Sequence, residues 1–137
     1  MTDTIQTNQE GEVFTTVTQL NAQETINSKV SSSSKGSAIY QAALSQVGTI
    51  QDCTMLVTNA LKSVGINYHD WPAGYMSLGT IVSVSEAQPG DLIYYANGGM
   101  GLAHIAVYAG NGQAVHGGWL GNQTVVNSTD VGSGAVY

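Results

Sequence analysis

The chain has 137 residues, enough for one domain with a short appendage. Three Lys and Arg residues stand against nine Asp and Glu residues, which gives a net charge of −6. This balance excludes proteins that bind nucleic acid or an anionic membrane surface through a basic face. The chain also lacks a run of about 18 apolar residues, the length of a membrane-spanning helix. The single cysteine excludes an internal disulfide.

Residues 1–36 differ from the rest of the chain because they are rich in Thr, Gln, Asn and Ser. The β-branched run at 13–20 predicts either a strand or an arm that orders on a partner. The first residues show neither the basic nor the apolar region of a secretory signal. Serine-rich residues 31–37 predict a flexible linker. We therefore expect a polar arm and linker over 1–36 and a folded domain over 37–137.

Two helices are predicted at the start of this domain. The first runs from Ser37, as N-cap, to Gly48. The second begins after Asp52, whose carboxylate suits an N-cap, and ends near Gly65. Its apolar residues recur at helical spacing: Leu56, Val57, Ala60, Leu61 and Val64. Cys53 would lie at the positive end of this helix, where the dipole favours the nucleophilic thiolate over the thiol.

The second half of the chain predicts a series of short strands. Residues 66–85 are aromatic and rich in turn formers, as is typical of a wall of a binding site. The expected strands follow at 92–95, 103–109, 113–116, 124–127 and 135–137. Two helices followed by a meander indicate an α+β fold, with the helices on one side of an antiparallel sheet.

Two histidines in this meander supply the chemistry that a catalytic thiol needs. His104 lies in one predicted strand and His116 ends the next, twelve residues later, across a tight turn. Neighbouring antiparallel strands bring such side chains within about 5 Å. His104 could then accept the proton of Cys53 while His116 orients its ring. A metal site from His69, His104, His116 and Asp91 lacks the close pair of a zinc motif, so we expect no metal.

The order of these residues resembles the NlpC/P60 family of cysteine peptidases. The resemblance covers about residues 38–137. It rests on the segments Asp-Cys, Gln-Pro-Gly-Asp-Leu-Ile-Tyr-Tyr, His-Ile-Ala-Val-Tyr-Ala-Gly-Asn-Gly and Ala-Val-His. It implies a papain-like core, in which helices pack on a short antiparallel sheet or half-barrel. It also implies Cys53 as nucleophile, His104 as base and His116 as third member, without a cofactor. The implied substrate is the peptidoglycan stem peptide, cut between D-γ-glutamyl and a diamino acid.

The chain departs from the family pattern around the nucleophile. Thr54 and Met55 stand where the family usually has Ser-Gly, and the Tyr that many members carry shortly before the cysteine is missing. The backbone N–H of Cys53 is expected to bind the oxyanion. Gln51 or Tyr68 is expected to supply a second donor. Asp52 borders the same site as N-cap. Trp119, which directly follows His116-Gly-Gly, is the aromatic residue expected to line the substrate groove.

Two rival functions stay open at this stage. The domain could be a catalytically idle structural or binding module of a phage tail. It could also be an amidase or acyltransferase that uses the same cysteine–histidine pair. The sequence of these motifs resembles that of phage tail-associated and lysin members of the family. It suggests residues 1–36 as a contact to phage tail proteins, and a location in the virion or at the bacterial cell wall.

Overall fold

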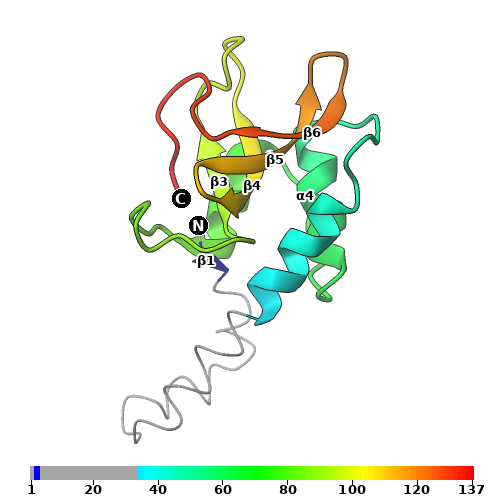
Figure 1. Cartoon of the computed structure of the whole chain (residues 1–137), viewed down its shortest axis with the longest axis vertical. Coiled ribbons are helices and arrows are strands. Elements are labelled where there is room, and N and C mark those ends of the chain that lie inside the picture. The colour runs from blue at the N-terminus through cyan, green and yellow to red at the C-terminus, as the bar shows by residue number, and fades with distance from the viewer. Residues whose placement is uncertain (1, 4–33) are drawn as a thin grey trace, which may run out of the picture.

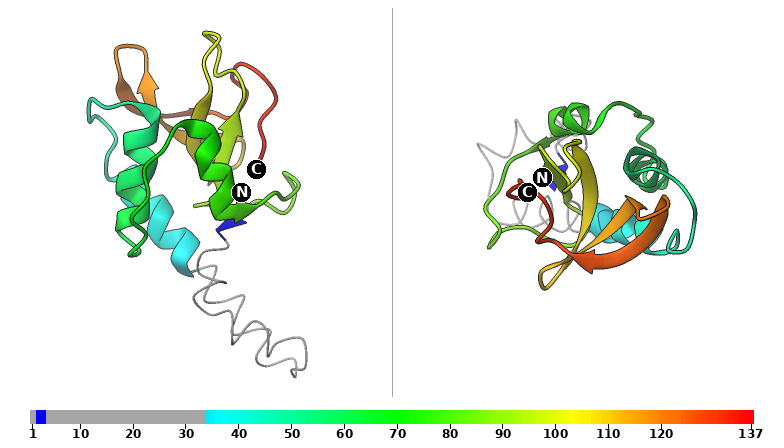
Figure 2. Two further views of the ribbon diagram at one scale, coloured as in Figure 1. Left: turned by 180° about the vertical axis from the view of Figure 1, so that it is seen from behind. Right: turned by 90° about the horizontal axis from the view of Figure 1, so that it is seen from above.

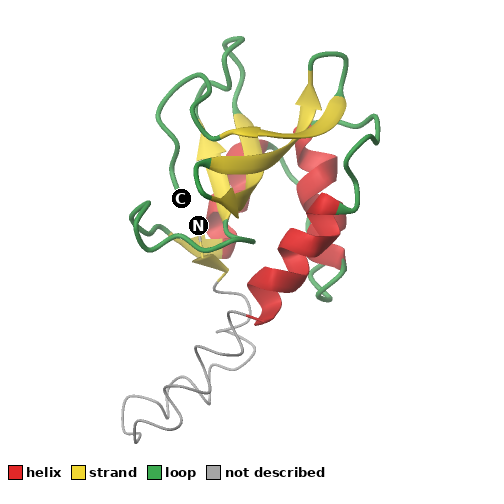
Figure 3. Ribbon diagram, viewed as in Figure 1, coloured by secondary structure: helices red, strands yellow, loops and turns green. Residues whose placement is uncertain are grey.

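The computed structural model of the protein describes residues 2–3 and 34–137. These residues form an α+β domain in which helices cover one side of an antiparallel sheet (Figures 1 and 3). The sheet has four strands in the order β3-β4-β5-β6. The predicted fold class is therefore confirmed. The strand or arm expected at 13–20 lies outside the described residues.

The helices and strands follow the predicted order. A helix covers residues 34–44. It is followed by α4 (Cys53–Lys62), the 3₁₀ helix η1 (Pro72–Leu78), β2 (Gly79–Thr80), β3 (Leu92–Tyr95), β4 (His104–Gly110), β5 (Gln113–Trp119) and β6 (Gln123–Ser128). The short β1 (Thr2–Asp3) pairs antiparallel with β2. Among the described residues, no helix combines the length and the apolar character needed to cross a membrane.

The beginning of the domain differs from the sequence-based expectation. Residues 34–37, assigned to a flexible linker, are already helical, so the first helix does not begin at Ser37. Ile39 and Ala43 of this helix are fully or almost fully buried in the core. Tertiary packing of such a face stabilises a helix more than local propensity does, and a serine-rich first turn is therefore tolerated. The helix also ends at residue 44, before the Gly48 expected to close it.

The strands alternate between two buried faces. Ile105 and Val107 of β4 pack with Leu56 and Val57 of α4 in the main core. The intervening residues of β4, among them Ala106, belong to a second cluster on the other face of the sheet. By the same period of two, His104 and His116 lie on that second face, as their spacing predicts.

The register of the sheet sets the two histidines close together. β4 and β5 pair antiparallel with Val107 opposite Val115, which places Ala106 opposite His116. His104 is therefore the diagonal neighbour of His116. The predicted last strand is reduced to a single bridge between Tyr94 and Val136. Figure 2 shows from above that the sheet is strongly curved.

A glycine bulge seats β5 against the beginning of α4. The register of β5 and β6 shifts between His116 and Trp119, across Gly117 and Gly118. A Cβ on Gly117 would lie 2.6 Å from the carbonyl oxygen of Asp52. Gly118 has a positive φ of 66°, and its N–H donates to the carbonyl of Gln51 at 2.8 Å. The bulge therefore holds β5, which contains His116, directly against the residues that precede Cys53.

We expect Gly117→Ala to destabilise the domain by about 1–3 kcal/mol, because an added methyl group must displace the Asp52 backbone in a packed contact. Gly134→Ala is the matched control, since a Cβ there meets no atom within 4 Å. Urea denaturation of both variants measures the free energy of unfolding. Equal stability of the two variants would contradict the close approach.

Candidate active site

Cys53 is the first residue of α4, and Asp52 caps the helix as predicted. The Asp52 Oδ1 atom accepts the N–H of Met55 at 2.8 Å and the hydroxyl of Thr54 at 2.8 Å. The first hydrogen bond of the helix joins the Leu56 N–H to the Asp52 carbonyl. The N–H groups of Cys53 and Thr54 therefore lie at the open, positive end of the helix.

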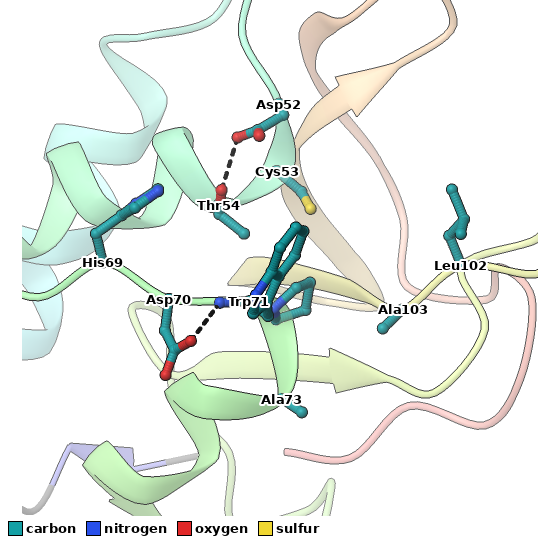
Figure 4. A pocket seen from close by; sticks show the side chains of 10 residues that line it. Asp52, Cys53, Thr54, His69, Asp70, Trp71, Ala73, Leu102 and Ala103 are labelled. Carbon is teal, nitrogen blue, oxygen red and sulfur yellow. Dashed lines mark hydrogen bonds between the residues drawn. The ribbon is translucent and has the colours of Figure 1, made fainter.

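The Cys53 thiol faces a cleft of about 750 Å³ at this end of α4. Figure 4 shows its sulfur and the Trp71 indole pointing into the same space, with Leu102 on the opposite side. The sulfur also accepts a hydrogen bond from the backbone N–H of Ile105. Because Ile105 directly follows His104, this contact places the thiol at the beginning of β4.

The two histidines form a hydrogen-bonded series that ends on the backbone. His104 Nε2 lies 2.9 Å from His116 Nδ1, and His116 Nε2 lies 2.9 Å from the Ser128 carbonyl oxygen. A carbonyl can only accept, so His116 Nε2 carries a proton. In neutral His116 the Nδ1 atom is then an acceptor, and His104 donates to it through Nε2. This assignment leaves a lone pair on Nδ1 of His104.

Burial keeps both imidazoles neutral. It lowers the pKa of His104 from 6.5 to about 4, with a smaller contribution from the neighbouring His116. Burial also lowers the pKa of His116, although the Ser128 and Asn127 backbone opposes the shift. The pair is thus uncharged at neutral pH, as the assigned tautomers require.

The thiol departs from the expectation that its position favours thiolate. Burial raises the pKa of Cys53, and the negative charge of Asp52 adds to this effect. The N–H groups of Ile105, Cys53 and Thr54 lower the pKa but do not outweigh burial. The expected net shift toward thiolate is therefore wrong for the resting site. Formation of the thiolate must depend on proton transfer to a base.

Aromatic rings enclose the second histidine. His116 is fully buried, and the centroid of its ring lies 5.0 Å from that of Trp119. Tyr95, also fully buried, lies beside both imidazoles and donates its hydroxyl to the Thr129 carbonyl at 2.7 Å. Trp119 therefore contacts His116, and it is not among the residues that line the cleft, where it was expected.

The two side chains proposed as a second oxyanion donor are engaged elsewhere. The amide nitrogen of Gln51 donates to Gln46 Oε1 at 2.9 Å and to Thr124 Oγ1 at 3.1 Å. Both of its amide hydrogens are thereby used, so the proposed role of Gln51 is wrong. The hydroxyl of Tyr68 lies within hydrogen-bonding distance of Asp70 Oδ2 and the Gly74 carbonyl. Tyr68 holds its own loop, and the cleft is lined by other residues.

His69 lies apart from the imidazole pair. It is exposed, lines the cleft, and its Nδ1 atom lies 2.9 Å from the Thr58 hydroxyl. In the described part of the chain, no three His, Cys, Asp or Glu side chains are grouped closely enough to hold a metal ion. The sequence-based hypothesis that His69, His104, His116 and Asp91 share a metal thus finds no such group there.

Sequence reasoning missed the backbone partners of the site. The Ser128 carbonyl that fixes the His116 tautomer and the Ile105 N–H that reaches the sulfur carry no side-chain signal. Leu102 in the loop before β4 was also missed as part of the cleft, although an apolar residue directly before the predicted strand that carries His104 could have indicated it.

Known proteins are similar to this chain in sequence. The sequence model of the NlpC/P60 family matches residues 40–133. The probable endopeptidase p60 of Listeria grayi is 32% identical over 99 residues, which cover 65% of this chain and 19% of that protein. The peptidoglycan endopeptidase RipA of Mycobacterium tuberculosis is 36% identical over 70 residues, or 50% of this chain and 14% of RipA. The chain thus spans less than a fifth of the length of these two relatives.

Solved structures share the fold. The P60 domain of the antigen MAP1204 from M. avium subspecies paratuberculosis aligns with a TM-score of 0.61 at 20% identity, over 76% of this chain and 90% of that domain. RipD from M. tuberculosis, described as a non-catalytic NlpC/p60 domain protein adapted to peptidoglycan binding, aligns with a TM-score of 0.56 at 19% identity. That match covers 75% of this chain and 96% of RipD. With the family match over most of the domain, the chain belongs to the NlpC/P60 family.

Proposed function

We propose that this domain is a cysteine endopeptidase that hydrolyses the stem peptides of bacterial peptidoglycan. One observation carries the proposal: the series from His104 through His116 to the Ser128 carbonyl leaves Nδ1 of His104 able to accept a proton, and the N–H of the next residue, Ile105, bonds to the Cys53 sulfur that faces the cleft. The p60 and RipA relatives, which are named as endopeptidases, support the same reaction class.

In the proposed reaction, Nδ1 of His104 accepts the thiol proton of Cys53, and the sulfur attacks the scissile carbonyl. The N–H of Cys53, at the positive end of α4, donates to the oxyanion. His104 then protonates the leaving amine, and water hydrolyses the thioester. Throughout, His116 holds the His104 ring by accepting its Nε2 proton.

Two finer parts of the proposal come from the sequence resemblance. The bond cut is the one between D-γ-glutamyl and the diamino acid. The setting is phage entry or lysis, with residues 1–36 as the contact to tail proteins and the virion or cell wall as the location. Mass spectrometry of digested peptidoglycan tests the bond, and detection of the chain in purified virions tests the setting.

Cys53→Ala should abolish peptide release, because the chain holds no other thiol. We expect release from purified peptidoglycan to fall at least about 10³-fold, to the background without protein. Mass spectrometry of the soluble products gives both rate and product. Circular dichroism should show an unchanged fold. Undiminished release by this variant would refute the mechanism, and a product cut at the glycan–peptide amide would indicate the rival amidase.

Thiol alkylation separates an active site from an idle module. In an active site, the alkylation rate of Cys53 should depend on His104 and change in His104→Ala. In an idle module like the one described for RipD, Cys53 would react slowly, with no dependence on the histidine.

His116→Ala should lower kcat by about 10²–10⁴-fold, because His104 loses the acceptor that fixes its tautomer. His116→Asn is the matched variant, since its amide oxygen can accept the same proton. We expect it to recover part of the lost kcat. Equal loss in both variants, with both folded by circular dichroism, would contradict a positioning role.

Activity should persist to unusually low pH for a histidine base. Protonated His104 cannot accept the thiol proton, so kcat/KM falls as the pH drops through the pKa of about 4 and is retained above it. A profile of kcat/KM from pH 4 to 8, with the fold monitored at each point, measures this limb. A midpoint near the ordinary 6.5 would contradict the effect of burial.

A further inference from the structure

The cleft at Cys53 carries negative charge on two of its walls. Asp52 lies at the first turn of α4 and Asp70 in the loop before η1, and both line the cleft. The Asp70 carboxylate accepts the Trp71 N–H at 2.7 Å and the Tyr68 hydroxyl at 2.9 Å. These bonds lower the pKa of Asp70, so it is ionised at neutral pH.

No described residue that lines this cleft is a Lys or Arg. The sequence holds three lysines, at 29, 35 and 62, and no arginine. Lys62 occupies the last turn of α4, about 13 Å along the helix axis from Cys53. Lys35 belongs to the helix over 34–44, and Lys29 lies outside the described residues. The walls that a substrate meets near the thiol therefore hold two carboxylates and neither lysine nor arginine, and their other members are His69, Thr54 and aromatic or apolar residues.

Exposed apolar side chains frame the same opening. Trp71 is 82% exposed and Leu102 is 74% exposed, although both line the cleft. Their loops are held in place: Asp70 binds the Trp71 backbone, and the Asn97 Oδ1 atom binds the N–H groups of Gly99 and Gly101. A substrate that covers Trp71 and Leu102 displaces water, which strengthens the field of the nearby carboxylates.

This arrangement bears on the proposed substrate, and the inference rests on the proposed function. A γ-linked glutamate keeps its α-carboxyl group next to the chain that leads to the scissile carbonyl. When free, that group is a carboxylate, which the acidic walls repel. When amidated, it is a neutral carboxamide, which can donate hydrogen bonds to carboxylates.

We propose that the cleft selects stem peptides whose glutamate α-carboxyl group is amidated over those in which it is free, with Asp70 as a specificity-determining residue. Asp52 contributes to the same selection, but its N-cap role ties it to the fold of the site. Asp70 can be altered without that cost, because asparagine can still accept from the Trp71 N–H and bond to the Tyr68 hydroxyl.

The test uses two synthetic stem tetrapeptides that differ only in this group, carboxylate or carboxamide. We expect the full chain to show a kcat/KM for the amide at least about tenfold higher at low salt, equivalent to about 1.4 kcal/mol. Asp70→Asn should reduce this ratio at least about threefold. The ratio should also fall in about 0.5 M NaCl, because salt screens the charges.

Glu86→Gln is the matched control for net charge. Glu86 is exposed, bonds to the Ser83 hydroxyl at 2.8 Å, and is not part of the cleft. The Glu86→Gln substitution removes the same charge as Asp70→Asn and should leave the ratio of the two kcat/KM values unchanged. A wild-type ratio near one, or an equal change in both variants, would overturn the proposal.

Calorimetric binding of the two peptides to Cys53→Ala separates this inference from the proposed reaction. Tighter binding of the amide by Cys53→Ala, weakened in Cys53→Ala with Asp70→Asn, supports the selection even if the wild-type chain cleaves neither peptide. In that case the proposed function fails and the selection stands. Equal binding of both peptides, or binding of neither, overturns the selection.

Discussion

The contact between the glycine bulge of β5 and the first turn of α4 is the constraint on which the site depends. The thiol comes from a helix and the imidazoles come from a sheet, so their relative position is set only where these elements meet. Gly117 and Gly118 bring the β5 backbone against Asp52 and Gln51, closer than any side chain would allow. Bulges that redirect a strand beside a functional site serve this purpose in other folds.

Once this contact has placed the side chains, burial determines the protonation states of the thiol and the two imidazoles. A resting site with a neutral thiol and neutral imidazoles avoids the cost of charges in a poorly solvated place. In the proposed reaction, charge appears when the thiol proton moves to His104. The Ser128 carbonyl, at the far end of the hydrogen-bonded series from His104, decides which nitrogen can take that proton. Under this proposal, a backbone atom of β6 sets the reactivity of Cys53 in α4.

Much of this arrangement could be predicted from local patterns. The Asp52 cap, the helix after it and the pairing of His104 with His116 follow from spacing and propensity, because each involves neighbours in the chain or in one hairpin. What could not be predicted depends on long-range contacts. Adjacency to Cys53 suggested Gln51 as an oxyanion donor, yet its side chain turns to Thr124, which is 73 residues away. The helical state of residues 34–37 likewise depends on burial of Ile39 and Ala43. The serine-rich composition of this segment does not indicate that burial.

Membership of the family does not by itself decide between catalysis and binding, since RipD shares the fold and is described as non-catalytic. The distinction has to come from the site. A fully buried imidazole such as His116 is costly to fold, and an apolar side chain of similar size would stabilise the sheet more. A domain that only bound peptidoglycan would gain nothing from that cost, since His116 is fully buried and is not among the residues that line the cleft. The cost is understandable when His104 must present one particular nitrogen to a thiol, as the proposed reaction requires.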